Sequence, residues 1–110
     1  EGRKISFDRA HPNTSVTFTP KPDESLLVKV DELKIACNVG DSIIWDVRSD
    51  GEWDGSNSRG NKRVGHLPGA IHIEWFNLME RDTHRFKPAE EIKRILATNG
   101  ITSDKNVYTY

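Results

Sequence analysis

One stretch of the sequence, residues 43–75, constrains the fold of this chain more than any other. It opens with an apolar run that ends on an acid and a base, Asp46 and Arg48, and it then crosses a long polar loop. After a turn at residues 65–70 it closes with a second apolar run, residues 71–75. Short runs rich in β-branched and aromatic residues, bounded by Gly and Pro, are typical of β-strands. We therefore predict two strands and place Asp46 and Arg48 at the carboxyl end of the first, where open α/β sheets bind their ligands.

The rest of the chain predicts an alternation of strands and helices. Residues 26–30 indicate a strand, followed by a helix whose apolar face is expected to bury Cys37. A clearer helix starts at Pro88, carries acidic residues in its first turn and stops at Gly100. Residues 107–110 indicate a further strand. This order predicts an α/β domain with a mostly parallel sheet and helices over both faces.

The two ends of the sequence bear on domain organisation. Residues 1–25 are polar and rich in turn formers, and we assign most of them to a linker or arm from a preceding domain, with a short edge strand at residues 16–19 as the alternative. Residues 26–110 form the domain itself. Its last predicted strand is followed by no crossover helix, so we expect the sheet to be incomplete at the C-terminus and the chain to be part of a longer polypeptide.

Composition excludes several classes of function. Sixteen basic residues against seventeen acidic ones give a formal charge of -1, which favours neither nucleic acid nor a membrane surface as a partner. No apolar run reaches membrane-spanning length, and the first residues lack the apolar core of a signal peptide, so we expect a cytoplasmic location. A single cysteine excludes an internal disulfide and a multi-cysteine zinc site.

The loop between the first two predicted strands carries charged and titratable residues. A short helix at residues 51–53 is predicted to begin this loop. The loop also carries three basic residues, Arg59, Lys62 and Arg63, which form either a solvated surface or a patch that attracts an anion. We expect His66, in the Pro-containing turn, to be a hydrogen-bonded structural histidine. Its spacing to His72 and His84 fits no compact metal motif, so we predict neither a metal site nor a cofactor.

Several motifs together resemble the rhodanese family of sulfurtransferases over roughly residues 26–110. The motifs are Ile-Trp-Asp-Val-Arg-Ser (44–49), Glu-Trp-Asp-Gly (52–55), Gly-His-Leu-Pro-Gly-Ala (65–70), the Glu74-Trp75 pair, Gly-Ile-Thr-Ser-Asp-Lys (100–105) and Val-Tyr-Thr-Tyr (107–110). The resemblance implies a rhodanese-like three-layer domain. It also makes the arm similar to the segment that leads into the second, active domain of two-domain bacterial thiosulfate sulfurtransferases, so a second rhodanese domain is expected in the same polypeptide.

The resemblance implies a persulfide mechanism. In the family a nucleophilic cysteine directly follows the strand that corresponds to residues 107–110, so it is expected directly after Tyr110, at the start of a loop whose backbone N–H groups hold a thiolate. The thiolate takes the outer sulfur of thiosulfate and passes it to cyanide or a thiol. Cys37 does not occupy that position, so we expect no catalytic residue in this chain and no activity from the chain alone.

The resemblance also implies residues that support the active site. Asp46 is expected to accept hydrogen bonds from loop or turn donors and Arg48 to form a buried ion pair, with a purely structural role as the alternative for both. Trp75 is expected at the rim of the pocket or, equally, in the core. Glu52 stands where animal two-domain members carry a substrate-binding arginine, which favours thiosulfate over 3-mercaptopyruvate as the donor. His66 completes this set.

Two other readings stay open at this point. The first is a non-catalytic rhodanese-like module that uses the fold to contact a protein. The second is a related phosphatase-type domain, which would need a cysteine loop one residue longer. The residues that follow position 110 would separate all three.

Overall fold

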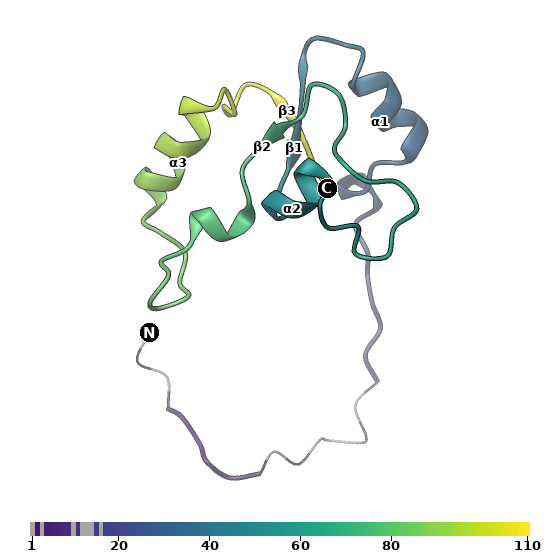
Figure 1. The fold of residues 1–110 in the computed structure, drawn as a ribbon. Coiled ribbons are helices and arrows are strands. Elements are labelled where there is room, and N and C mark those ends of the chain that lie inside the picture. Colours follow the sequence, from purple (N-terminus) through teal and green to yellow (C-terminus); the bar gives the residue numbers. More distant parts are fainter. Residues whose placement is uncertain (1, 3, 10, 12–14, 16) are drawn as a thin grey trace.

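The computed structural model describes residues 2, 4–9, 11, 15 and 17–110 (Figure 1). Its elements are η1 (Glu24–Leu26), α1 (Val30–Ala36), β1 (Ser42–Asp46), α2 (Asp50–Asp54), β2 (Ile71–His72), η2 (Trp75–Leu78), α3 (Ala89–Thr98) and β3 (Asn106–Thr109). None of the helices in the described ranges has the length and apolar character needed to cross a membrane. The alternative edge strand at residues 16–19 includes residue 16, which lies outside the described residues.

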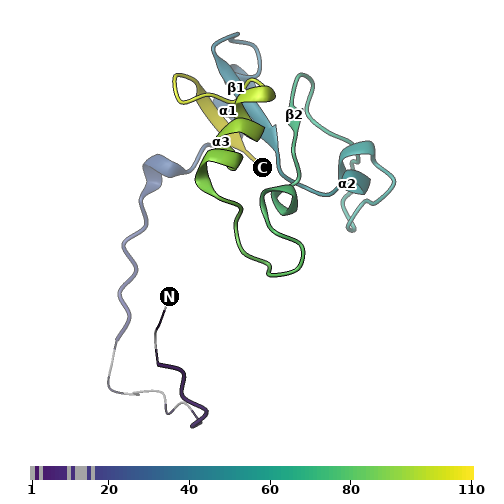
Figure 2. The same ribbon diagram turned by 90° about the vertical axis from the view of Figure 1, so that its left-hand side faces the viewer.

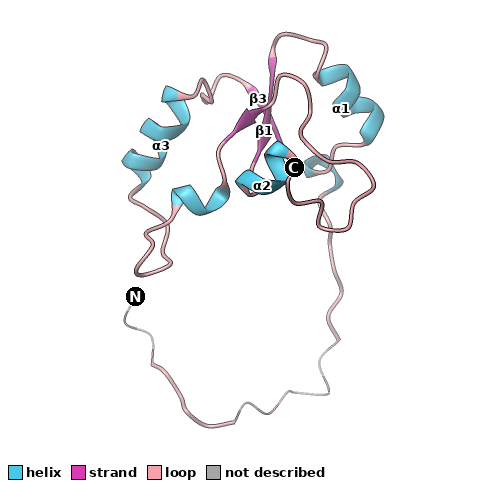
Figure 3. Ribbon diagram, viewed as in Figure 1, coloured by secondary structure: helices cyan, strands magenta, loops and turns pink. Residues whose placement is uncertain are grey.

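The three strands form one parallel sheet in the order β2-β1-β3 (Figure 3). The central strand β1 pairs Trp45 with Ile71 on one side and Ile44 with Tyr108 on the other. Because a central strand is covered on both faces, its apolar residues are consecutive rather than alternating. The predicted α/β class with a parallel sheet is therefore confirmed.

Helices cover the two faces of this sheet. Helix α3 lies over one face and α1 lies over the other, and the two perpendicular views in Figures 1 and 2 both show this arrangement. The core on the α3 side is built around Ile73, Leu78 and Ile101. On β1, Ile43 and Trp45 pack against this cluster, while the intervening Ile44 is buried. The alternation follows from the pleat of the strand, which directs successive side chains to opposite faces.

Helix α3 forms where the sequence predicts it. Glu90 and Glu91 lie in its first turn, where carboxylates interact favourably with the helix dipole. Asn99 caps its C-terminus, and Gly100 follows with a φ of 79°, a conformation in which a residue without Cβ is least strained. Its apolar stripe, which includes Ile92, packs on the core cluster.

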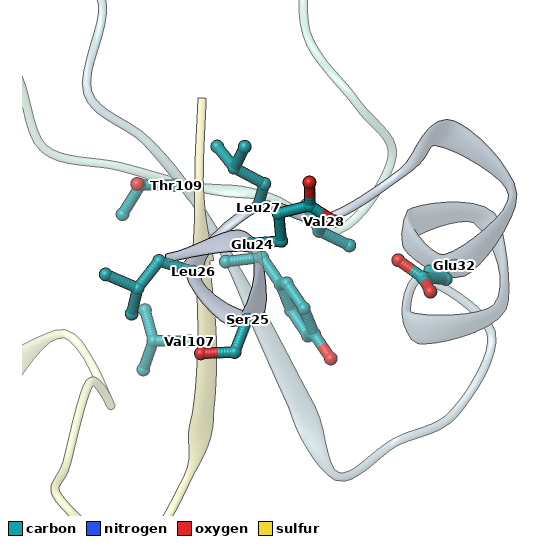
Figure 4. A pocket seen from close by; sticks show the side chains of 9 residues that line it. Glu24, Ser25, Leu26, Leu27, Val28, Glu32, Val107 and Thr109 are labelled. Carbon is teal, nitrogen blue, oxygen red and sulfur yellow. The ribbon is translucent and has the colours of Figure 1, made fainter. Parts of the chain in front are cut away.

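The predicted strand at residues 26–30 is wrong. Residues 24–26 form the short helix η1, and Val30 already belongs to α1. Leu26 and Leu27 are 81% and 70% exposed, and between them and β3 lies a hollow of about 470 Å³ (Figure 4). An isolated strand leaves its backbone groups unpaired, so apolar and β-branched residues alone do not make one. Among the described residues, β3 pairs with β1, and residues 26–30 pair with no strand.

Two smaller expectations also need correction. Cys37 is exposed, because α1 ends at Ala36 and it is Ala36 that occupies the buried position. The second strand is shorter than predicted: β2 ends at His72, and Trp75 begins the helix η2. The predicted short helix after β1 is confirmed as α2.

The turn before β2 owes its shape to one glycine. The N–H of Ala70 donates to the carbonyl oxygen of Leu67 at 3.1 Å, and between them Pro68 is followed by Gly69 with a φ of 76°. A four-residue turn with Pro as its second residue and a positive φ at its third residue is a type II turn. Such turns favour Gly as the third residue. This turn fixes the direction in which the chain enters β2.

We expect Gly69→Ala to lower the free energy of unfolding by about 1–2 kcal/mol, because Cβ is strained at positive φ. Gly40→Ala is the matched control: a Cβ at either glycine would meet no atom within 4 Å, and only Gly69 has a positive φ. The control should change stability by less than about 0.5 kcal/mol or slightly raise it. Denaturant unfolding of both variants checks this, and equal stabilities would contradict the proposed turn strain.

Candidate functional site

An ion pair closes the carboxyl end of the central strand. Asp46 is 0% exposed, and both of its carboxylate oxygens are bound by Arg48. Nε of Arg48 donates to Oδ1 at 2.9 Å and Nη2 donates to Oδ2 at 2.6 Å, while the backbone N–H of Arg48 donates to Oδ1 at 3.0 Å. The predicted ion pair is therefore present. We predicted loop or turn donors for Asp46, and Arg48, in the loop directly after β1, supplies three hydrogen bonds to it.

The pair fixes the charge state of both groups. Burial acts to raise the pKa of Asp46, but hydrogen bonds from the side chain and backbone of Arg48, a hydrogen bond with Tyr110 and the positive charge of Arg48 together outweigh it, so the pKa lies below its ordinary value. The same side-chain hydrogen bond raises the pKa of Arg48. The site thus holds a carboxylate that stays ionised despite complete burial.

Arg48 also joins the other elements at this edge of the sheet. Its Nη2 donates to the carbonyl oxygen of Gly65 at 2.9 Å, and its guanidinium carbon lies 4.9 Å from the ring centre of Tyr110. The Tyr110 hydroxyl in turn accepts from the N–H of Leu67 at 2.9 Å. Burial raises the pKa of this hydroxyl. One guanidinium therefore links the ends of β1 and β3 to the turn before β2.

Three aromatic rings stack beside this group. The Trp53 ring lies 3.4 Å from that of His66 at 8° between planes, and 4.7 Å from that of His72 at 6°. Nδ1 of His66 lies 2.9 Å from the carbonyl oxygen of Trp53, and Nε2 of His72 lies 2.9 Å from that of Arg48. The histidines hold α2 against the turn and β2. Sequence reasoning gave Trp53 no role, although it lies inside one of the motifs.

The other two expected site residues take different places. Glu52 accepts from the Ser49 hydroxyl at 2.7 Å in the capping box of α2, and this hydrogen bond is the main cause that lowers the pKa of Glu52. Oε2 of Glu52 also lies 3.6 Å from Nε of Arg59. Trp75 is 52% exposed, so core packing, one of its two predicted roles, is wrong. The backbone N–H of Trp75 donates to the carbonyl oxygen of Val47 at 3.0 Å, which keeps Trp75 close to the end of β1.

The described residues contain no cluster of three or more His, Cys, Asp or Glu side chains that could hold a metal ion. His84, the third histidine of the sequence pattern, lies on the loop before α3 with its ring 6.2 Å from that of Phe76. His66 and His72 instead meet on Trp53. The basic side chains of Lys62 and Arg63 are exposed on the loop that precedes the turn.

Comparisons with known proteins agree with this architecture. "Putative thiosulfate sulfurtransferase 1" of Mycobacterium bovis is 34% identical over 118 residues, an alignment that covers 100% of this chain and 41% of that protein. "Sulfur carrier protein TtuD" of Thermus thermophilus is 34% identical over 120 residues, covering 100% and 42%. The chain thus spans about two fifths of the length of these relatives.

A solved structure and a family model extend the comparison. A variant of EanB, with ergothioneine covalently linked to a cysteine persulfide, superposes with a TM-score of 0.73 at 32% identity, covering 90% of this chain and 26% of that one. The family model described as "Rhodanese-like domain" matches residues 29–110, about three quarters of the sequence. The chain therefore belongs to the rhodanese-like family.

Proposed function

We propose that this domain is part of a sulfurtransferase that moves sulfane sulfur from thiosulfate to cyanide or a thiol through a cysteine persulfide. The names of the relatives support the reaction class. One observation carries the proposal for this chain: Tyr110 packs against the guanidinium of Arg48 at the carboxyl edge of the sheet. A nucleophilic cysteine directly after Tyr110 would lie just beyond the carboxyl edge of the sheet, beside the Asp46–Arg48 pair.

The proposed reaction has two balanced steps. A cysteine thiolate attacks the outer sulfur of thiosulfate, the S–S bond of thiosulfate breaks, and sulfite leaves with the electron pair. The acceptor then attacks the outer sulfur of the persulfide, and the cysteine thiolate leaves with the electron pair of the second S–S bond. Cys37 is a poor candidate for the nucleophile, because it lies in the segment that leads into the amino end of β1, opposite the edge that holds Arg48.

The proposed roles of the site residues follow from their contacts. Arg48 holds the turn before β2 and faces Tyr110, so it positions the start of the nucleophile loop. Asp46 orients Arg48. Trp75 forms an exposed aromatic rim near the end of β1. Glu52 supplies no cation for the carboxylate of 3-mercaptopyruvate, which supports thiosulfate as the donor. His66, on the turn that Arg48 holds, completes the support.

The intact polypeptide should form thiocyanate from thiosulfate and cyanide, and mass spectrometry should show a cysteine after Tyr110 that gains one sulfur atom. Replacing that cysteine by serine should abolish both signals, since the thiolate is the nucleophile. The 110-residue chain alone is the inactive control. A residue other than cysteine after Tyr110, or an intact protein without persulfide, would contradict the proposal and favour the non-catalytic interaction module.

The proposed anchoring role of Asp46 predicts a stability effect. Asp46→Ala should lower the free energy of unfolding of the intact protein by about 1–3 kcal/mol, because it leaves the donors of a partly buried guanidinium unpaired. Asp31→Ala is the control, since Asp31 pairs with Lys34 on the surface, where its side chain is 91% exposed. That change should cost less than about 0.5 kcal/mol. Equal losses in denaturant unfolding would refute the anchoring role.

The same pair predicts acid sensitivity. The folded-state pKa of Asp46 lies below its ordinary value of 3.8, so its contribution to stability is present above that value and is lost as the pH falls through the folded-state pKa. Wild type should therefore lose stability below about pH 4 more steeply than Asp46→Asn, which cannot titrate at this position. Melting temperatures measured from neutral pH into acid check this, and parallel curves for the two proteins would count against it.

A further inference from the structure

The position of His66 is fixed on both sides by residues of the site. The preceding residue, Gly65, accepts a hydrogen bond from Nη2 of Arg48 at 2.9 Å. The following residue, Leu67, donates its N–H to the Tyr110 hydroxyl at 2.9 Å. The backbone of His66 therefore cannot shift without breaking a contact to Arg48 or Tyr110, the two residues that meet at the carboxyl edge of the sheet.

The orientation of the imidazole ring is also fixed. The ring stacks on Trp53 with 3.4 Å between centres, and its Nδ1 lies 2.9 Å from the carbonyl oxygen of Trp53. A carbonyl oxygen can only accept, so Nδ1 carries the hydrogen. In the neutral ring the lone pair is then on Nε2. The residue is exposed, and no residue in the described ranges provides a hydrogen-bond partner for Nε2.

The neighbouring histidine shows the opposite arrangement. His72 stacks on the same Trp53, but its Nε2 is bound to the carbonyl oxygen of Arg48, and its side chain is 16% exposed with Nδ1 facing Asp50 at 3.7 Å. Both of its nitrogens therefore face protein atoms. At this edge of the sheet, the described part of the chain offers a free, oriented imidazole nitrogen at His66.

We propose that His66 is a general base for thiol acceptors of sulfur, an inference that rests on the proposed function. A thiol has an ordinary pKa of about 8.5, so at neutral pH it is mostly protonated, whereas the thiolate is the nucleophile. In the step, the S–H bond of the acceptor breaks and its proton moves to Nε2 of His66. The freed electron pair forms a bond to the outer sulfur of the persulfide. The persulfide S–S bond then breaks, its electron pair goes to the nucleophilic cysteine, and Nε2 releases the proton to water.

The test compares two acceptors on the intact protein after the persulfide has been formed with thiosulfate. Dithiothreitol must lose a proton to attack, and sulfite attacks as an anion. His66→Asn keeps an N–H donor near the carbonyl oxygen of Trp53 and removes the base. Single-turnover transfer to dithiothreitol should fall on the order of 100-fold, the usual range for a lost general base, while transfer to sulfite stays within about twofold.

His84→Asn is the matched control, because it makes the same change on the loop before α3, away from Arg48 and Tyr110, and Asn tolerates the φ of 51° found there. It should alter neither rate. Should His66→Asn fold poorly, His66→Gly with added imidazole should recover transfer to dithiothreitol, and no recovery would contradict the inference. Equal loss with both acceptors, or no loss with either, would also overturn it. An intact wild-type protein that forms no persulfide would instead contradict the proposed function.

Discussion

The buried ion pair between Asp46 and Arg48 is the interaction on which the arrangement of this edge depends. A carboxylate that is completely removed from water is costly unless its oxygens are bound and its charge is matched. Arg48 meets both needs through three hydrogen bonds. To do so its side chain folds back over the end of β1, and this conformation also lets Nη2 donate to the carbonyl oxygen of Gly65. The buried ion pair is thus tied directly to the turn before β2.

The hydrogen bonds of the pair constrain the geometry of this edge of the sheet. A buried ion pair is often no more stable than an apolar replacement, but its polar atoms must each be matched by a partner. No buried side-chain nitrogen or oxygen lacks a partner in the described ranges. The apolar contacts of Ile73, Leu78 and Ile101 supply stability on the α3 side of the sheet without fixing the carboxyl edge. The polar contacts of Arg48 fix that edge.

Sequence reasoning succeeded where the signal is local and failed where it depends on distant partners. The central strand and α3 were predictable because their apolar patterns and caps lie within a few residues of each other. The roles of Asp46 and Arg48 came from the family resemblance, which did not identify the two residues as each other's partners. The strand at residues 26–30 was wrong because its pattern carries no information about a neighbouring strand. The predicted burial of Cys37 was wrong because α1 ends one residue earlier, and Ala36 takes the buried position. The role of Trp53 was missed because its stacking partners follow it by more than ten residues, across an irregular loop.

The stacked rings show how a rigid frame can prepare a reactive atom. Trp53 orients His66 through its ring and its carbonyl oxygen, and that same His66 lies between the residues that Arg48 and Tyr110 hold. A group positioned in this way loses little further freedom when a reactant arrives, which is the main advantage of preorganisation in catalysis. The hydrogen on Nδ1 is assigned by a backbone carbonyl, and this leaves Nε2 as the free acceptor. The contacts that hold the ion pair in place and the contacts that orient this nitrogen therefore belong to one connected network.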